Sequence, residues 1–278
     1  MTMTDGVFPE LRDWHATRNA LHAYTKVLGS IRAHFSEPHP SWWHGSLLPY
    51  TSGLSTTNIP HPSKTDQTFS ISLEMRNHYV LYSNSEGFVE QIRISDGIAP
   101  KELFDQLAIM MEADGIDPQI EVKFEDLDQH DYSIDKAGKY FLALSRASKI
   151  LSEIKEKSSL DSSPVQLWPH HFDLSLELFG NKEIMEEGNE GGKPYRSQIG
   201  IGFAPFDEQH DYPYFYVNPL PFDKEITKAQ LAHGATWHPE GWHGACLPYA
   251  KLTNVKNGEQ VLAEFLEGAI EIERKLII

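Results

Sequence analysis

The chain of 278 residues contains one cysteine, few basic residues and no long apolar run. Because Cys246 is the only cysteine, no intrachain disulfide can form, which fits a reducing compartment. The longest apolar runs, residues 107–111 and 276–278, are far too short to span a bilayer. Residues 1–6 lack the basic and apolar regions of a secretory signal. These absences predict a soluble, cytosolic protein.

Positive charge is also scarce, since 40 acidic residues face 24 basic ones and the formal net charge is −16. Such a surface repels the phosphates of nucleic acids and anionic lipid headgroups, so we expect neither as a partner. Glycine-rich phosphate-binding motifs are missing as well. The pair Gly200 and Gly202 lies in a strand pattern that no helix follows, and we expect no nucleotide cofactor.

The periodicity of apolar residues predicts an α+β fold, in which long helices near both termini cover an antiparallel β-sheet. Helical patterns cover residues 9–35, 100–114, 136–157 and 257–276. Strand patterns cover residues 42–50, 54–59, 69–75, 78–82, 89–94, 120–124, 165–179, 196–203, 212–217 and 242–249. The strands are grouped between the helices rather than alternating with them, and this grouping favours an antiparallel sheet.

A serine-rich segment, residues 157–163, predicts a boundary between two halves. The first half, residues 1–157, would hold a helix, antiparallel strands and two further helices. The second half, residues 164–278, would hold strands and then a terminal helix. A chain of this length can bury one large core, so we expect the halves to form one compact unit. The acidic segments 125–135 and 183–193 are expected to be loops.

An octapeptide occurs twice, as Trp43-His44-Gly45-Ser46-Leu47-Leu48-Pro49-Tyr50 and as Trp242-His243-Gly244-Ala245-Cys246-Leu247-Pro248-Tyr249. Six of the eight positions are identical. If each copy is a strand, its histidine, second leucine and tyrosine share one face. Neighbouring strands would then bring His44 and His243 to one cavity, close to His171 or Asp173. The alternative is that the repeat reflects only similar packing of two strands.

The segment Trp168-Pro169-His170-His171-Phe172-Asp173 is the densest group of reactive side chains. On a continuous strand, His171 and Asp173 would share a face, with Cα atoms roughly 7 Å apart. They could hold a metal ion together with a third ligand, or Asp173 could fix the tautomer of His171. The alternative is that the pair caps a turn or the end of a sheet.

Three functions remain open from these residues. The leading hypothesis is a small-molecule-binding protein whose pocket is lined by aromatic and histidine side chains. The candidates for that pocket are His22, Trp43, His44, Tyr50, His78, Trp168, His170, Tyr214 and His243. The second is a hydrolase that uses a divalent metal ion. Its candidate ligands are His171, Asp173, His44, His78 and His243. The third is a structural or interaction protein without a site.

Two of these side chains also have a structural interpretation. His22 lies beside the apolar stripe of the first predicted helix, and a buried histidine bonded to a carbonyl is the more common case there. Cys246 has no basic neighbour in sequence other than His243, and we expect a buried, unreactive thiol.

Several segments resemble a bacterial family described only as a domain of unknown function, number five-nine-nine-six. The matching segments include Trp14-x-x-Thr17-x-x-x-Leu21-His22, Trp42-Trp43, Gly53-Leu54-x-Thr56-Thr57-x-Ile59-Pro60, Phe69 to His78, Phe172-Asp173-Leu174, Gly202-Phe203, His238-Pro239-Glu240 and Leu247-Pro248-Tyr249. They span nearly the whole chain, so the resemblance implies one family unit and no fusion. The resemblance implies no activity. It favours a site centred on His22, His78 and Asp173 over one built from His44, His170, His171 and His243.

Overall fold

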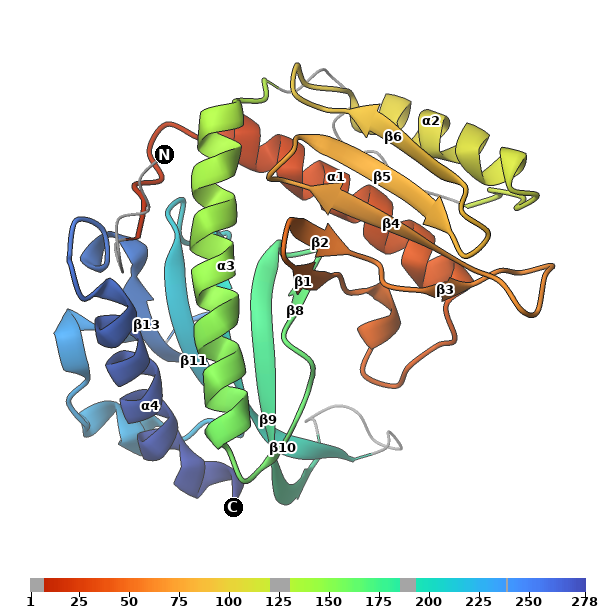
Figure 1. Cartoon of the computed structure of the whole chain (residues 1–278). Coiled ribbons are helices and arrows are strands. Elements are labelled where there is room, and N and C mark those ends of the chain that lie inside the picture. Colours follow the sequence, from red (N-terminus) through yellow and green to blue (C-terminus); the bar gives the residue numbers. More distant parts are fainter. Residues whose placement is uncertain (1–7, 121–130, 186–193, 239) are drawn as a thin grey trace. The chain divides into compact units, whose positions relative to one another are not determined.

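The computed structural model describes residues 8–120, 131–185, 194–238 and 240–278 (Figure 1). The chain divides into two compact units. Unit 1 comprises Met1–Glu10, Ala143–Val165 and Asp173–Ile278, and unit 2 comprises Leu11–Leu142 and Gln166–Phe172. The helix α3 (Ile134–Lys157) contributes its first part to unit 2 and the rest to unit 1.

Unit 2 contains an antiparallel sheet with the strand order β1-β2-β4-β5-β6, in which β3 also pairs with β4. The strands are β1 (Leu48–Tyr50), β2 (Gly53–Ser55), β3 (Ile59–Pro60), β4 (Thr68–Glu74), β5 (Tyr79–Asn84) and β6 (Val89–Arg93). Alternation in β4 buries Phe69, Ile71 and Leu73, as the sequence pattern predicts. The short strand β8 (Gln166–Trp168) also belongs to this unit, through a bridge between Leu47 and Leu167.

Two helices complete unit 2, namely α1 (His15–Phe35) and α2 (Pro100–Ala113). One face of α1 is apolar at helical spacing, and its residues Leu21, Tyr24, Leu28 and Ile31 are fully buried. The hydroxyl of Tyr24 donates to the carbonyl of Ile98 at 2.9 Å. The helix starts six residues later than predicted, and it ends at Phe35, as expected from the proline residues that follow.

Unit 1 contains an antiparallel sheet with the strand order β12-β13-β11-β10-β9-β7. The strands are β7 (Asp161–Ser162), β9 (Asp173–Ile184), β10 (Tyr195–Ala204), β11 (Tyr214–Leu220), β12 (Thr236–His238) and β13 (Gly244–Pro248). Three short 3-10 helices, η2 (Lys224–Lys228), η3 (Ala232–Gly234) and η4 (Tyr249–Lys251), lie between β11 and the last helix. The predicted boundary segment 157–163 lies within this unit.

The helix α4 (Gly258–Ile277) covers one face of the unit 1 sheet and contacts β9, β10 and β11 (Figure 1). It begins after Asn257, as predicted, although the Asn257 side chain makes no capping bond. Its buried stripe includes Leu262, Phe265, Leu266 and Ala269. The hydroxyl of Ser197 on β10 donates to the carbonyl of Ile277 at 2.8 Å and ties the helix end to the sheet.

The predicted α+β class with antiparallel sheets is confirmed. The helices are not confined to the ends of the chain, because α2 and α3 lie in the interior of the sequence. Within the described ranges, none of the helices combines the length and apolarity that a bilayer crossing requires. The predicted strand at 120–124 and the predicted loops at 125–135 and 183–193 fall largely outside the described residues.

Candidate functional site

The face of the unit 1 sheet opposite α4 carries polar and aromatic side chains. Side chains alternate along β10, and Ser197 is bonded to the end of α4, so Ile199, Ile201 and Phe203 face the helix. Gly200, Gly202 and Ala204 therefore face the other way. Their partners on β11 are Asn218, Tyr216 and Tyr214. This second face, rather than the helix-covered core, is where the candidate site of unit 1 lies.

Gly202 allows Tyr216 to lie across the sheet. A Cβ atom at Gly202 would lie 2.4 Å from the Tyr216 hydroxyl, which is closer than real atoms approach. Because glycine leaves this space open, Tyr216 reaches over β10, and its hydroxyl donates to Oδ2 of Asp173 on β9 at 2.6 Å. Asp173 is thus bonded to a tyrosine of its own unit.

Asp207 follows β10 and accepts hydrogen bonds from three side chains. The Tyr214 hydroxyl donates at 2.6 Å, Nε1 of Trp242 at 3.1 Å and Nδ1 of His210 at 2.9 Å. Burial opposes ionisation of Asp207, but the bonds from Tyr214 and His210 outweigh it and hold the pKa of the carboxyl below its usual value. An ionised carboxylate only accepts hydrogen bonds, so Nδ1 of His210 carries the proton.

His238 on β12 has the same tautomer as His210, for a different reason. Its Nδ1 lies 2.8 Å from the carbonyl oxygen of Trp242, and a carbonyl only accepts. The His238 ring stacks on the Trp242 indole, with ring centroids 4.3 Å apart and planes inclined by 13°. The ring centroids of His210 and His238 are 5.0 Å apart. In the neutral form of each ring Nε2 is therefore the unprotonated nitrogen, and among the described residues neither Nε2 atom has a hydrogen-bond partner.

We refer to Asp207, His210, Tyr214, His238 and Trp242 as the Asp207 cluster. Tyr214 and Trp242 are nearly parallel, inclined by 8°, and they pack against Cys246. Burial, followed by the nearby Asp207 charge, raises the pKa of the Cys246 thiol to about 12. The thiol is therefore protonated at neutral pH and fills space rather than acting as a nucleophile, and its predicted burial is confirmed.

His22 has the structural role that its position in the first helix suggested. Its Nε2 bonds to the carbonyl of Pro169 at 2.9 Å, and its ring stacks on Phe172 with centroids 5.2 Å apart. Burial, supported by the charge of Lys26, lowers the pKa of His22 to about 4. Through this hydrogen bond and this stack, the neutral imidazole holds the turn after β8 against α1.

The predicted long strand 165–179 is wrong, because a turn at residues 169–172 separates β8 from β9. Phe172 has a left-handed backbone, with φ 61°, and its amide bonds to the carbonyl of Trp168 at 2.7 Å. Strict alternation therefore does not place His171 beside Asp173. In this turn the rings of His170 and His171 are 4.2 Å apart, and the Trp168 ring meets His170 edge-on at 5.8 Å.

The other sequence-predicted histidines make separate contacts. His78 lies in the turn before β5, and its Nδ1 bonds to the Tyr132 hydroxyl at 2.9 Å. His243 stacks on Phe222, with centroids 4.6 Å apart. Nδ1 of His44 accepts from the backbone amide of His39 at 3.0 Å. Among the residues that the structure describes, no group of three or more His, Cys, Asp or Glu side chains is arranged to hold a metal ion.

The two octapeptides differ in local structure. In the first copy, Trp43–Gly45 is a 3-10 helix, η1, and only the last three residues, which include Tyr50, form β1. In the second copy, Gly244–Pro248 forms β13. The strand prediction for both histidines is therefore wrong, and the two copies belong to different sheets. A shared cavity for His44 and His243 stays a prediction.

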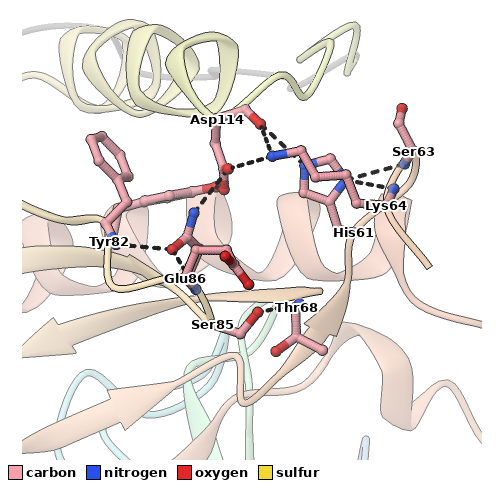
Figure 2. Close-up of polar contacts among 10 residues, drawn as sticks. His61, Ser63, Lys64, Thr68, Tyr82, Ser85, Glu86 and Asp114 are labelled. Atoms are coloured by element: carbon pink, nitrogen blue, oxygen red, sulfur yellow. Dashed lines mark hydrogen bonds and ion pairs between the residues drawn. The ribbon is translucent and has the colours of Figure 1, made fainter. Parts of the chain in front are cut away.

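A second polar cluster, not predicted from the sequence, surrounds Asp114 at the end of α2 (Figure 2). Its carboxylate accepts from the Tyr82 hydroxyl at 2.8 Å, from Nδ2 of Asn84 at 2.8 Å and from Nζ of Lys64 at 3.2 Å. Its carbonyl bonds to Nε2 of His61 at 3.2 Å, while Nδ1 of His61 accepts from the amides that follow it. Because these groups bond to each other, the cluster stabilises the fold and offers little to a ligand.

Sequence reasoning found Tyr214 and placed Trp242 in the octapeptide, but it missed the importance of Asp207, His210 and His238. A local signal was present. Asp207 and His210 lie three residues apart in a turn, and both the Asp207 carboxylate and its backbone bond back to His210. The convergence with His238 and Trp242 depends on the pairing of β11 with β13 and of β13 with β12.

A family model described as "Family of unknown function (DUF5996)" matches residues 8–276. The match covers nearly the whole chain, so the chain belongs to this family, as the motif resemblance implied. Comparison with curated proteins finds no match, and comparison with solved structures finds none either.

Proposed function

We propose that unit 1 binds a small molecule at the Asp207 cluster, and that the molecule donates hydrogen bonds to the cluster. One observation carries this proposal. The rings of His210 and His238 lie 5.0 Å apart, each with a proton on Nδ1, so that Nε2 of the neutral ring is an acceptor. Both histidines are half-buried, and a ligand that donates to both Nε2 atoms gains two hydrogen bonds at once.

The site is preorganised for such a ligand. Asp207 fixes the His210 ring, and the Trp242 carbonyl together with the indole face fixes the His238 ring. Ligand binding therefore orders few side chains, and less affinity is lost to conformational entropy. Tyr212, which is 46% exposed, meets the His210 ring edge-on at 5.2 Å and adds an apolar surface.

The ligand class follows from these acceptors and from the charge of the chain. In the neutral rings two Nε2 atoms can accept from hydroxyl or amino groups, and the net charge of −16 disfavours anions. The proposal names a small neutral or cationic molecule with two donor groups, such as an amino- or hydroxy-substituted ring. Of the pocket predicted from sequence, Tyr214 belongs to this cluster, whereas Trp43, Tyr50 and Trp168 belong to unit 2.

Ligand screening of three variants tests the proposal. Ligand-observed NMR against a panel of aminopyridines, aminopyrimidines, catechols and amino alcohols should find binders of the wild-type protein. His210→Ala and His238→Ala should each weaken binding by about tenfold or more. Each substitution removes one hydrogen-bond acceptor for the ligand, and such a bond is worth about 1.4 kcal/mol. The matched control is His243→Ala, which removes a stacked histidine outside the cluster and should retain wild-type affinity. Equal binding by all three variants would contradict the proposal.

A hydrolase is the second candidate, and the Asp207–His210 pair favours it. A carboxylate that holds Nδ1–H leaves Nε2 as a base, which is the arrangement of an acid–base histidine. We expect any ester or amide hydrolysis, assayed with and without Zn²⁺ or Mn²⁺, to fall by at least a hundredfold in His210→Ala and to persist in His243→Ala. Hydrolysis that survives in His210→Ala would exclude this role for His210.

A further inference from the structure

The repeated segment is longer than eight residues. His39-Pro40 precedes the first copy by the same spacing as His238-Pro239 precedes the second, so the repeat reads His-Pro-x-x-Trp-His-Gly-x-x-Leu-Pro-Tyr. In both copies the first histidine stacks on the tryptophan four residues later. The ring centroids are 4.3 Å apart in each, with interplanar angles of 10° for His39 and Trp43 and 13° for His238 and Trp242. The same His-to-Trp spacing in the two copies thus produces the same local His–Trp stack.

The two stacks share a left-handed residue directly before the tryptophan, but the type of residue at that position differs. The position before the stacked tryptophan has a left-handed backbone in both copies, with φ 80° at Gly241 and φ 59° at Trp42. Glycine adopts this conformation without steric cost, whereas a bulky side chain is strained there. Strain of this kind at an exposed residue points to a function for the side chain.

Trp42 is held on the surface rather than packed in the core. Its side chain is 70% exposed, the largest exposed fraction among the exposed large apolar residues that the structure describes. Its ring stacks on the His44 ring, with centroids 5.4 Å apart and planes inclined by 24°. The bond from the Trp42 amide to the His39 carbonyl, at 2.9 Å, closes the turn beneath it.

His39 and His44, the two histidines near Trp42, have the opposite tautomer to the histidines of the Asp207 cluster. Nδ1 of His44 accepts from the His39 amide at 3.0 Å, and Nδ1 of His39 accepts from the Ser41 amide at 3.1 Å. In the neutral rings the proton is therefore on Nε2, which makes both rings donors. Within the described part of the chain, neither Nε2 has an acceptor.

We propose that Trp42, with His39 and His44, forms a carbohydrate-binding surface on unit 2. The apolar face of a sugar ring would lie on the exposed indole, and its hydroxyl oxygens would accept from Nε2–H of the two histidines. A neutral sugar matches a surface that offers an aromatic face and neutral donors on a chain with net charge −16. This site is separate from the Asp207 cluster, which offers acceptors instead of donors.

Substitution of Trp42 by glycine tests this site without unfolding the chain, because glycine occupies the equivalent position of the second copy. The probes are maltotetraose, cellotetraose, chitotetraose and mannotetraose, with binding measured by saturation-transfer NMR. We expect at least one to bind, Trp42→Gly to lose at least tenfold in affinity, and Trp42→Gly to melt at or above the wild-type temperature. The matched control is Ile109→Ala, which removes an apolar residue that is 65% exposed and should leave binding unchanged.

Three outcomes would overturn the proposal. The first is that none of the four sugars binds. The second is that Trp42→Gly binds sugar as tightly as the wild type. The third is that Trp42→Gly changes only the molecular mass in solution, which would make Trp42 a contact between copies of the chain. His210→Ala should keep full sugar affinity, so failure at the Asp207 cluster and failure here are distinguishable.

Discussion

Replacement of Glu273 by leucine should stabilise the protein by about 3 kcal/mol at pH 7. Glu273 lies on the buried stripe of α4 and is fully buried, and neither carboxylate oxygen has a hydrogen-bond partner among the residues that the structure describes. Burial alone raises the pKa of this carboxyl from 4.5 to about 9. The folded chain must therefore take up a proton at neutral pH, and this uptake costs free energy that leucine avoids.

The sign of the pH dependence follows from the direction of the shift. Between pH 4.5 and about 9, the folded state holds a proton on Glu273 that the unfolded state has released. Stability therefore falls as pH rises through this window, and the advantage of Glu273→Leu grows from pH 5 to pH 8.5.

Urea unfolding of both proteins at several pH values measures this dependence. The exposed neighbour Glu271 provides the matched control, since Glu271→Leu should change stability by less than about 0.5 kcal/mol. A gain for Glu273→Leu that is equal at all pH values would show that ionisation of Glu273 is not the cause.

Replacement of Asp114 by alanine should destabilise the protein by roughly 3 kcal/mol. The Asp114 side chain is only 3% exposed, and its removal leaves the Tyr82 hydroxyl and the Asn84 amide without their acceptor (Figure 2). The Lys64 ammonium would keep only its bond to the Asp114 carbonyl. Asp114→Asn retains the shape and one acceptor oxygen, so we expect about half of this loss.

Thermal unfolding and hydrogen exchange at α2 measure the effect of Asp114. Burial opposes ionisation, but the bonds from Asn84, Tyr82 and Lys64 hold the pKa of Asp114 below its usual value. The stabilisation is therefore present at neutral pH and is lost as the solution is acidified below about pH 4. As a control, Asp105→Ala breaks an exposed ion pair with Lys101 on α2 and should cost less than about 1 kcal/mol. An equal loss for both variants would argue against a special role for the Asp114 cluster.

Regular periodicity determined the elements that depend on local spacing. The strand β4, the helix α3 and the C-terminal helix α4 lie where alternation or helical spacing predicted them, because each buries one face of a regular element. At the end of α4, Ile272 and Leu276 continue the apolar spacing of the helix, whereas the fully buried positions are Glu273 and Ile277. Hydrophobicity alone does not predict a buried carboxyl, since its ionised form is normally excluded from a core.

Residue patterns predicted the secondary structure of the histidine-containing segments less well. Strict alternation through 165–179 did not anticipate the left-handed Phe172, which ends one strand and lets the chain turn into β9. Likewise, one octapeptide sequence forms η1 and β1 in one unit and β13 in the other. Short segments adopt the conformation that their pairing partners stabilise, and those partners are far away in sequence.

The sequence by itself determined the fold class, the helices, most strands, the family and the identity of the repeated motif. Only the tertiary structure decided which histidines share an environment. Asp207 and His210 follow β10, His238 ends β12, and Trp242 precedes β13, so the register of three strand pairings brings them together. The bonds that set the two tautomers are local, from His210 to Asp207 and from His238 to the Trp242 carbonyl, but the approach of the two rings to each other depends on strand pairings between segments that are distant in sequence.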